Sequence, residues 1–157
     1  MDSLVDGHKY VSGLRAVVYG EEDLVVGLCA WLSEIGVRPV LAATGARNRG
    51  LEARVLAACG DLVREKPVVR EGADFQDIAE EARTLSPDFL VGHSKGYRYA
   101  REWGLPLLRV GFPLHDRFGG QRLLHVGYRG AQSLFDILVN LVLDKRQSDS
   151  SVGYGYL

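Results

Sequence analysis

The chain has 157 residues, 46% of them hydrophobic, which is enough for one domain with a substantial core. Its formal net charge of −1 gives no general attraction to nucleic acid or to an anionic membrane. It has no apolar run of about eighteen residues and no secretory signal pattern, and Cys29 and Cys59 form no C-x-x-C motif. We therefore expect a cytoplasmic protein with no nucleic-acid partner and no membrane span.

Five short runs of apolar residues are typical of strands that are buried on both faces of a parallel sheet. They lie at 15–19, 38–43, 67–70, 88–91 and 107–110.

Segments with helical spacing of apolar residues separate these runs. A helix with apolar positions from Leu24 to Ile35 ends at Gly36, and a long final helix begins near Gly130. Shorter helices are predicted at 51–58, 75–85 and 96–103. The tail, residues 147–157, is rich in serine, glycine and tyrosine and is predicted to be irregular.

This alternation predicts a single α/β domain over residues 1–157, a three-layer α/β/α sandwich with a parallel sheet, Rossmann-like or chelatase-like. The expected strand order is 3-2-1-4-5. Ligands of such sheets bind at the carboxyl ends of the strands, near the switch point between the first and fourth strands.

Residues 92–96, Gly-His-Ser-Lys-Gly, satisfy the G-x-S-x-G pattern of a nucleophile elbow, and Asp116 and His125 follow in the order of an α/β-hydrolase triad. However, the helix after Ser94 has room for only about two turns, and no H-G-G-type oxyanion loop precedes it. A tight turn between strand and helix would need the same two glycines. A serine hydrolase using Ser94, Asp116 and His125 is therefore the least favoured alternative.

The segment GFPLHDRFGG, residues 111–120, follows the last predicted strand and is long for a connection that leads into a helix. Guanidinium groups near the end of a strand suit an anionic ligand or a carboxylate on a partner. An ion pair of Asp116 with Arg117 or Arg122 that only fixes the loop is an equal alternative. The candidate interface or anion-contact residues are Arg109, Phe112, His115, Asp116, Arg117, Arg122 and Arg129.

A second, weaker candidate for anion binding is the loop at 44–50, where Arg47, Asn48 and Arg49 precede a helix N-terminus. If both loops faced one cleft, the chain would be a small-anion-binding module. The acidic turn at 20–23 argues against a dinucleotide, because a Rossmann fingerprint places glycines there. The four histidines show no ligand spacing, so no metal site and no catalytic residue are predicted.

Two stretches, residues 13–45 and 86–145, resemble the C-terminal domain of nitrogenase component 1-type proteins. The specific motifs are Gly-Phe-Pro with Asp-Arg at 111–117 and Gly-Tyr-Arg-Gly at 127–130, which are similar to the β-type chains. The His-Ser and Asp-Tyr-Ser-Gly signature of the α-type chains is absent. Within the β-type chains, DRFGGQR at 116–122 and the ending VGYGYL look most similar to subunits of the scaffold that assembles the iron–molybdenum cofactor.

The resemblance implies a chain about one third as long as its relatives, and a domain with no activity of its own. It implies a role in nitrogen fixation, in which an α-type scaffold subunit pairs with this chain in a heterotetramer and the nitrogenase iron protein is a further partner. The iron–sulfur or iron–molybdenum cofactor precursor would be held by the full complex, since neither Cys29 nor Cys59 matches a cluster ligand of the family. The structural β chain of the molybdenum–iron protein is the second choice.

Overall fold

The computed structural model describes residues 2–63 and 65–152. Five parallel strands form one sheet in the order β3-β2-β1-β4-β5, as the sequence predicts. β1 lies at the centre, and the connections change direction between β1 and β4. The strands are β1 (Arg15–Tyr19), β2 (Arg38–Thr44), β3 (Val68–Glu71), β4 (Phe89–Gly92) and β5 (Leu107–Arg109).

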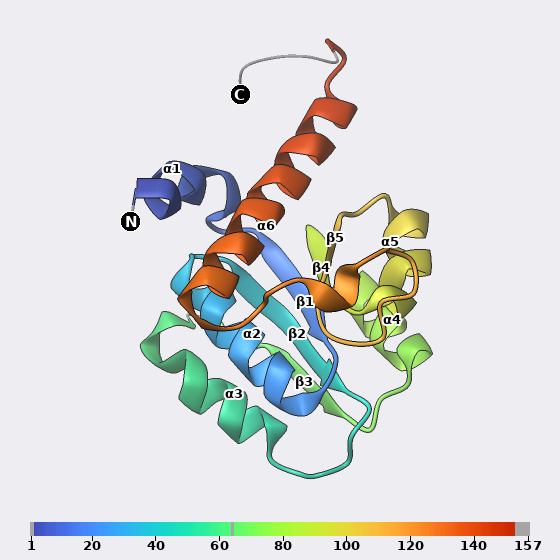
Figure 1. Cartoon of the computed structure of the whole chain (residues 1–157). Coiled ribbons are helices and arrows are strands. Elements are labelled where there is room, and N and C mark those ends of the chain that lie inside the picture. The colour runs from blue at the N-terminus through green and yellow to red at the C-terminus, as the bar shows by residue number, and fades with distance from the viewer. Residues whose placement is uncertain (1, 64, 153–157) are drawn as a thin grey trace.

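Helices cover both faces of the sheet and complete three layers (Figure 1). One group, α1, α2, α3 and α6, packs on the face that carries the larger core, and α4 and α5 pack on the other face. The helices are α1 (Asp2–Val11), α2 (Glu22–Glu34), α3 (Leu51–Cys59), α4 (Phe75–Thr84), α5 (Tyr97–Trp103) and α6 (Gly127–Asp149).

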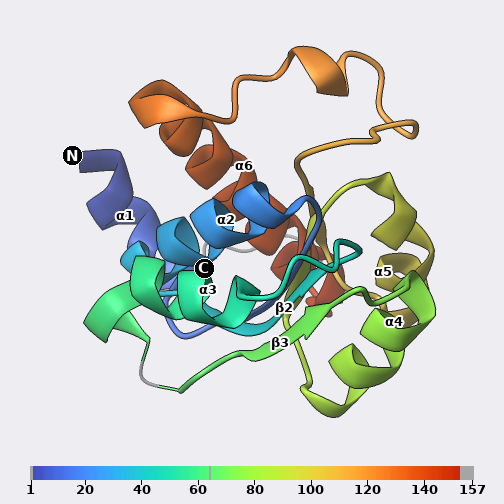
Figure 2. The same cartoon turned by 90° about the horizontal axis from the view of Figure 1, so that it is seen from below.

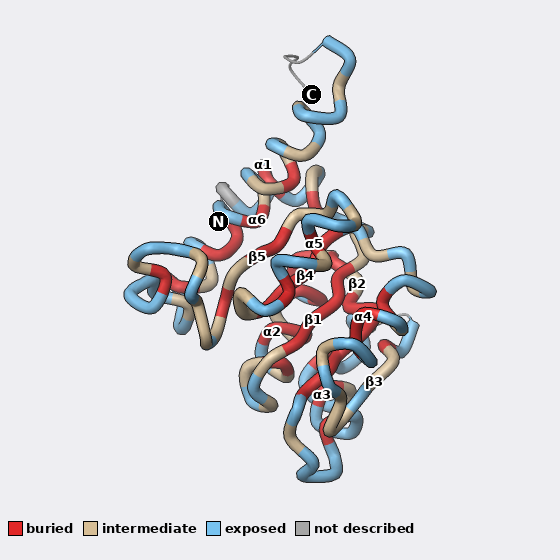
Figure 3. The backbone as a smooth tube through the Cα atoms, turned by 90° about the vertical axis from the view of Figure 1, so that its right-hand side faces the viewer, coloured by how far each residue is buried: buried red, intermediate tan, exposed pale blue. Residues whose placement is uncertain are grey.

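The central strands are buried along their length because each face of the sheet meets helices (Figure 3). In β1, Ala16 and Val18 face the larger core, whereas Val17 and Tyr19 face the smaller one. The side chain of Tyr19 is therefore placed at the carboxyl end of the central strand, next to the switch point. None of the helices in residues 2–63 and 65–152 is long and apolar enough to cross a bilayer.

The structure differs from the predicted elements at both ends of the chain. α1 was not predicted; it contains Gly7, whose missing side chain lets the helix approach Phe135 of α6, where a Cβ would lie 2.5 Å from the ring. α6 begins at Gly127 rather than near Gly130 and continues to Asp149. The first part of the tail predicted to be irregular is thus helical, and residues 153–157 lie outside the described residues.

The connection from β5 to α6, residues 110–126, is a long loop. In Figure 2 it leaves the sheet beside α5 and passes across the molecule to the start of α6. It contains a short 3₁₀ turn, Gly120–Arg122, and a cis peptide bond between Phe112 and Pro113. This connection carries five of the seven candidate interface or anion-contact residues: Phe112, His115, Asp116, Arg117 and Arg122.

Candidate interaction site at the carboxyl edge of the sheet

Tyr19 fills the turn that follows β4. Its phenol donates a hydrogen bond to the carbonyl oxygen of His93 at 2.7 Å. A Cβ at Gly92 would lie 2.4 Å from the Tyr19 carbonyl oxygen, and one at Gly96 would lie 1.9 Å from the phenolic oxygen. Gly92 also has a φ of +155°, which side chains rarely adopt. Both glycines of the G-x-S-x-G pattern are therefore required by close packing against Tyr19.

Ser94 joins this turn to the connection that follows β5. Its hydroxyl donates to the carbonyl oxygen of Pro113 at 2.6 Å and accepts from the backbone N–H of His115 at 2.8 Å. The Ser94 backbone N–H also donates to Pro113, at 3.0 Å. A single residue thus makes three hydrogen bonds across two neighbouring loops.

Arg109, the last residue of β5, holds the same connection by an ion pair. Its Nε and Nη2 lie 2.9 and 2.7 Å from Oδ2 of Asp116, and its guanidinium carbon lies 5.3 Å above the centre of the Tyr97 ring. The hydrogen bond from Arg109 lowers the pKa of Asp116 and keeps it ionised. The sequence alternative paired Asp116 with Arg117 or Arg122. The structure has the ion pair with Arg117, at 3.8 Å, but Arg109 is the closer partner of Asp116, and Arg122 lies over Phe118.

The outer surface of this region combines large apolar side chains with arginines. We name residues 111–129 the arginine–aromatic segment. Phe118 is fully exposed and Tyr128 is 98% exposed, which is unusual for aromatic rings in an ordered structure. Arg117, Arg122 and Arg129 are exposed in the same stretch. The exposed large apolar residues of the segment are Phe112, Phe118, Leu123, Leu124, Val126 and Tyr128.

The hydrolase triad is not assembled. The Ser94 hydroxyl is engaged with Pro113 and His115, and Oδ2 of Asp116 is bound by Arg109. Both Nε2 of His125 and Oδ1 of Asp116 are buried with no hydrogen-bond partner in the structure. Burial lowers the pKa of His125, but no bond leads from it to the serine. A nucleophile would need its base within hydrogen-bond reach.

Two polar groups at the second loop are bound by the chain's own acids. The N–H of Leu51, at the start of α3, donates to Oε1 of Glu71 at 2.7 Å, so a carboxylate already occupies that helix N-terminus. The Asn48 amide donates to Glu22 at 2.8 Å. Arg47 lies against Gly72, and Arg49 is exposed with a φ of +54°. An external anion at Arg47, Asn48 and Arg49 would therefore compete with Glu22 for the Asn48 amide and with Glu71 for the N–H of Leu51, and this site stays a prediction.

Comparison with known proteins shows the family of the chain. Residues 1–143 match the family described as nitrogenase component 1 type oxidoreductase. The chain belongs to the nitrogenase component 1 family. The match covers the sheet, all of α1 to α5 and most of α6, including the arginine–aromatic segment.

Its relatives in this family include β chains. The nitrogenase molybdenum–iron protein β chain of Methanothermobacter thermautotrophicus is 35% identical over 144 residues, which is 91% of this chain and 31% of that protein. The corresponding β chain of Rippkaea orientalis is 31% identical over 154 residues, 97% of this chain and 30% of that protein. The chain thus spans about a third of the length of these relatives.

A solved structure, "Nitrogenase Cp1 at pH 6.5", superimposes with a TM-score of 0.92 at 27% identity and covers 99% of this chain and 34% of that one. A chain of "Nitrogenase Cp1 at pH 5" superimposes with a TM-score of 0.66 at 14% identity, a likeness of fold alone. The parallel sheet and its helices are therefore the architecture of a nitrogenase component 1 domain.

The family is named for an oxidoreductase, but this domain does not fit a metallocluster by itself. Cys29 and Cys59 are buried in the core between α2 and α3, and burial raises the pKa of each thiol. Ligation of iron requires the thiolate, which burial disfavours. In the described part of the chain, no three histidine, cysteine or acidic side chains are grouped to hold a metal ion. No chemical step on a cluster is therefore assigned to these residues.

Sequence reasoning missed two parts of the site. The sequence predicts Tyr19 only as the end of a strand. The pattern that could have indicated its packing against the turn after β4 is the pair of glycines, Gly92 and Gly96, that it contacts. The apolar residues from Leu123 to Tyr128 were not singled out. Their signal is an apolar run with neither helical nor strand spacing, placed just before a helix.

Proposed function

We propose that this chain is a domain of a nitrogenase iron–molybdenum cofactor assembly scaffold, of the type of biosynthesis scaffold protein N. In this role it pairs with an α-type subunit and helps to enclose the precursor cluster, and it catalyses nothing alone. The arginine–aromatic segment supplies the contact surface. The observation that carries the proposed contact surface is the exposure of six large apolar side chains in one ordered stretch.

The energetics of that stretch favour an interface. A fully exposed aromatic side chain gains roughly 1.5–3 kcal/mol when it is completely buried, so Phe118 and Tyr128 are candidate anchors for a partner. Arg117, Arg122 and Arg129 would lie around them as a cationic border. Because Arg109 neutralises Asp116, this border favours a partner surface that carries carboxylates.

A scaffold role is supported by the sequence DRFGGQR at 116–122 and by the ending VGYGYL, which resemble scaffold subunits. The structural β chain of a molybdenum–iron protein is a second candidate, supported by relatives of that name at up to 35% identity. The two roles differ in what the purified assembly does. A structural β chain belongs to a complex that reduces dinitrogen itself, whereas a scaffold only restores reduction to a nitrogenase that lacks its cofactor.

The first test is the double variant Arg117→Ala, Arg122→Ala in the full-length protein, purified with its α-type subunit. Removing two charges beside the aromatic anchors should weaken assembly by about tenfold or more and should depend on salt. Assembly is measured by analytical ultracentrifugation, and function by cofactor maturation of a cofactor-free nitrogenase.

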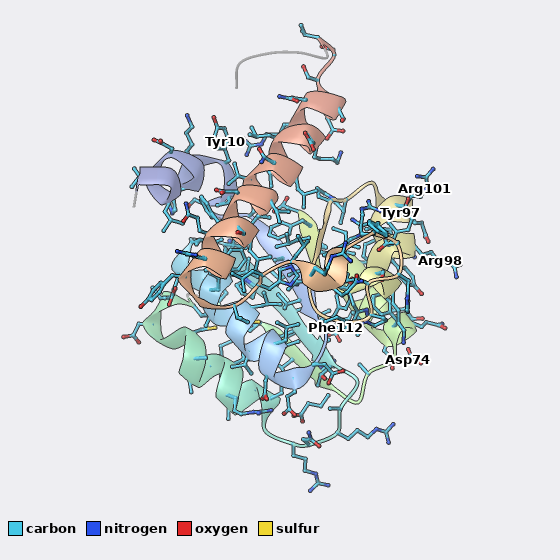
Figure 4. The ribbon with its side chains drawn as sticks, viewed as in Figure 1. Tyr10, Asp74, Tyr97, Arg98, Arg101 and Phe112 are labelled. Atoms are coloured by element: carbon cyan, nitrogen blue, oxygen red, sulfur yellow. The ribbon has the colours of Figure 1, made fainter. Side chains whose placement is uncertain are left out.

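The control is Arg83→Ala, Arg98→Ala, which removes two exposed arginines from α4 and α5 on the other face of the sheet. Arg98 is labelled in Figure 4. This variant has the same change in net charge and should assemble normally. If both double variants assemble and support maturation like the wild type, the proposed surface is wrong.

A further inference from the structure

The anchoring of the arginine–aromatic segment is concentrated near its start. Ser94 bonds Pro113 and His115, and Arg109 bonds Asp116. The residues that follow, from Arg117 to Arg129, are mostly exposed. The bonds made at 113–116 therefore help to set the direction in which Phe118 leaves the domain.

Ser94 is the member of this anchor that spans two loops. It belongs to the turn after β4, whose backbone is fixed by Tyr19 packed against Gly92 and Gly96. Its hydroxyl is both donor and acceptor for the segment, to the Pro113 carbonyl oxygen and from the His115 N–H. A side chain without the hydroxyl would leave the His115 N–H without this acceptor while the backbone bond from Ser94 to Pro113 remained.

Holding a loop before it binds removes part of the entropy lost on binding. The arginine–aromatic segment is ordered although Phe118 and Tyr128 are exposed to solvent. Its conformation therefore does not depend on the burial of those rings, as is expected of a loop that is held before it binds. Arg109 gives a second, charged anchor at Asp116, so loss of the serine hydroxyl loosens the segment without unfolding the domain.

We propose that Ser94 is a positioning residue whose hydroxyl holds Pro113 and His115, so that the arginine–aromatic segment meets its partner in the binding conformation. This rests on the proposed function, in which that segment contacts the α-type subunit. The motif that spells a nucleophile elbow thus serves to orient an interface.

The test uses Ser94→Ala, the rescue variant Ser94→Thr, which keeps a hydroxyl, and the control Ser133→Ala, which removes an exposed hydroxyl from α6. Hydrogen exchange by mass spectrometry compares the peptide 111–119 with the core peptide 134–142 of the same full-length protein. Surface plasmon resonance measures association with the immobilised α-type subunit.

Ser94→Ala should raise exchange in 111–119 by about fivefold or more, leave 134–142 unchanged, and slow association by about five- to tenfold. Ser94→Thr should restore both values to within about twofold of wild type, and Ser133→Ala should match wild type. Such a pattern is not expected of a change that merely lowers global stability, because the core peptide would then exchange faster too.

Unchanged exchange in 111–119, or faster exchange with unchanged association, overturns the positioning role of Ser94 and leaves the proposed interface standing. A wild-type protein that does not associate with the α-type subunit overturns the proposed interface and the role of Ser94 in presenting it. A threonine variant that behaves like alanine while its core peptide stays protected also contradicts the proposal.

Discussion

Tyr19 and the glycines around it form the most tightly constrained contact at the scale of single residues. The phenol is buried and donates to the His93 carbonyl oxygen, and burial raises the pKa of the phenol. Gly96 has no room for a side chain on this side, since the phenolic oxygen occupies the place of a Cβ. The identity of residue 96 thus depends on the identity of residue 19.

Gly96→Ala should lower the free energy of unfolding by about 1–3 kcal/mol, because the added methyl group overpacks against Tyr19. In a Tyr19→Phe background the loss should be smaller, because the phenolic oxygen that causes the closest contact is absent. Urea denaturation of the two single variants and the double variant forms a double-mutant cycle. Strict additivity of the two losses would contradict the contact.

At the scale of elements, two helical glycines predict opposite effects of the same substitution. Gly27 lies in the middle of α2 and is exposed, with open space where a Cβ would be. Gly7 lies in α1, where a Cβ would lie 2.5 Å from the Phe135 ring. Glycine in a helix interior is otherwise destabilising relative to alanine.

Gly27→Ala should therefore stabilise the domain by about 0.5–1 kcal/mol, whereas Gly7→Ala should destabilise it because α1 must move away from α6. Thermal unfolding followed by circular dichroism checks both signs. Two shifts of the same sign would mean that helix propensity or packing alone governs both helices.

The contrast between α1 and the strands explains what the sequence could predict. The strands were found to within one residue at each end because buried parallel strands are continuous apolar runs, which depend little on their partners. α1 was missed because its closest fit comes from a glycine that matters only when α6 is present. The strands can thus be predicted from the local sequence pattern, whereas α1 depends on a tertiary contact that the pattern does not show.

The candidate site divides in the same way. The strand order predicted from the sequence places the connection after β5 beside the switch point, where the structure has it. The charged residues of that connection were named from the sequence as interface candidates, and this role stays a prediction; the apolar residues from Leu123 to Tyr128 were not named. The choice of Arg109 as the partner of Asp116 was not predicted, because it depends on the fold of the connection between them. The same fold decides that Leu123 and Tyr128 face solvent and not the core.

At the scale of the whole molecule, the apolar side chains of the arginine–aromatic segment lie outside both cores. Their replacement should change how molecules meet and should leave the folding of each one nearly unchanged. In Figure 1 the segment crosses in front of the sheet, away from the protruding end of α6.

The double variant Phe118→Ser, Tyr128→Ser should keep the melting temperature within about 2 °C of wild type, because both rings are exposed already. It should reduce self-association of the chain at high concentration, since a large apolar patch is removed. Sedimentation velocity over a concentration series measures this. A marked fall in melting temperature would show that these rings contribute to folding and not to docking.

The packing of Tyr19 against the turn after β4 has a consequence for the classification of proteins by motif searches. A search for G-x-S-x-G would group this chain with serine hydrolases. Its two glycines are instead required because Tyr19, the last residue of the neighbouring strand β1, occupies the space of their side chains. The distinguishing information lies about seventy residues upstream, at the end of β1. A filter that asks whether a bulky residue ends the adjacent parallel strand would separate turns shaped by packing from turns that expose a nucleophile.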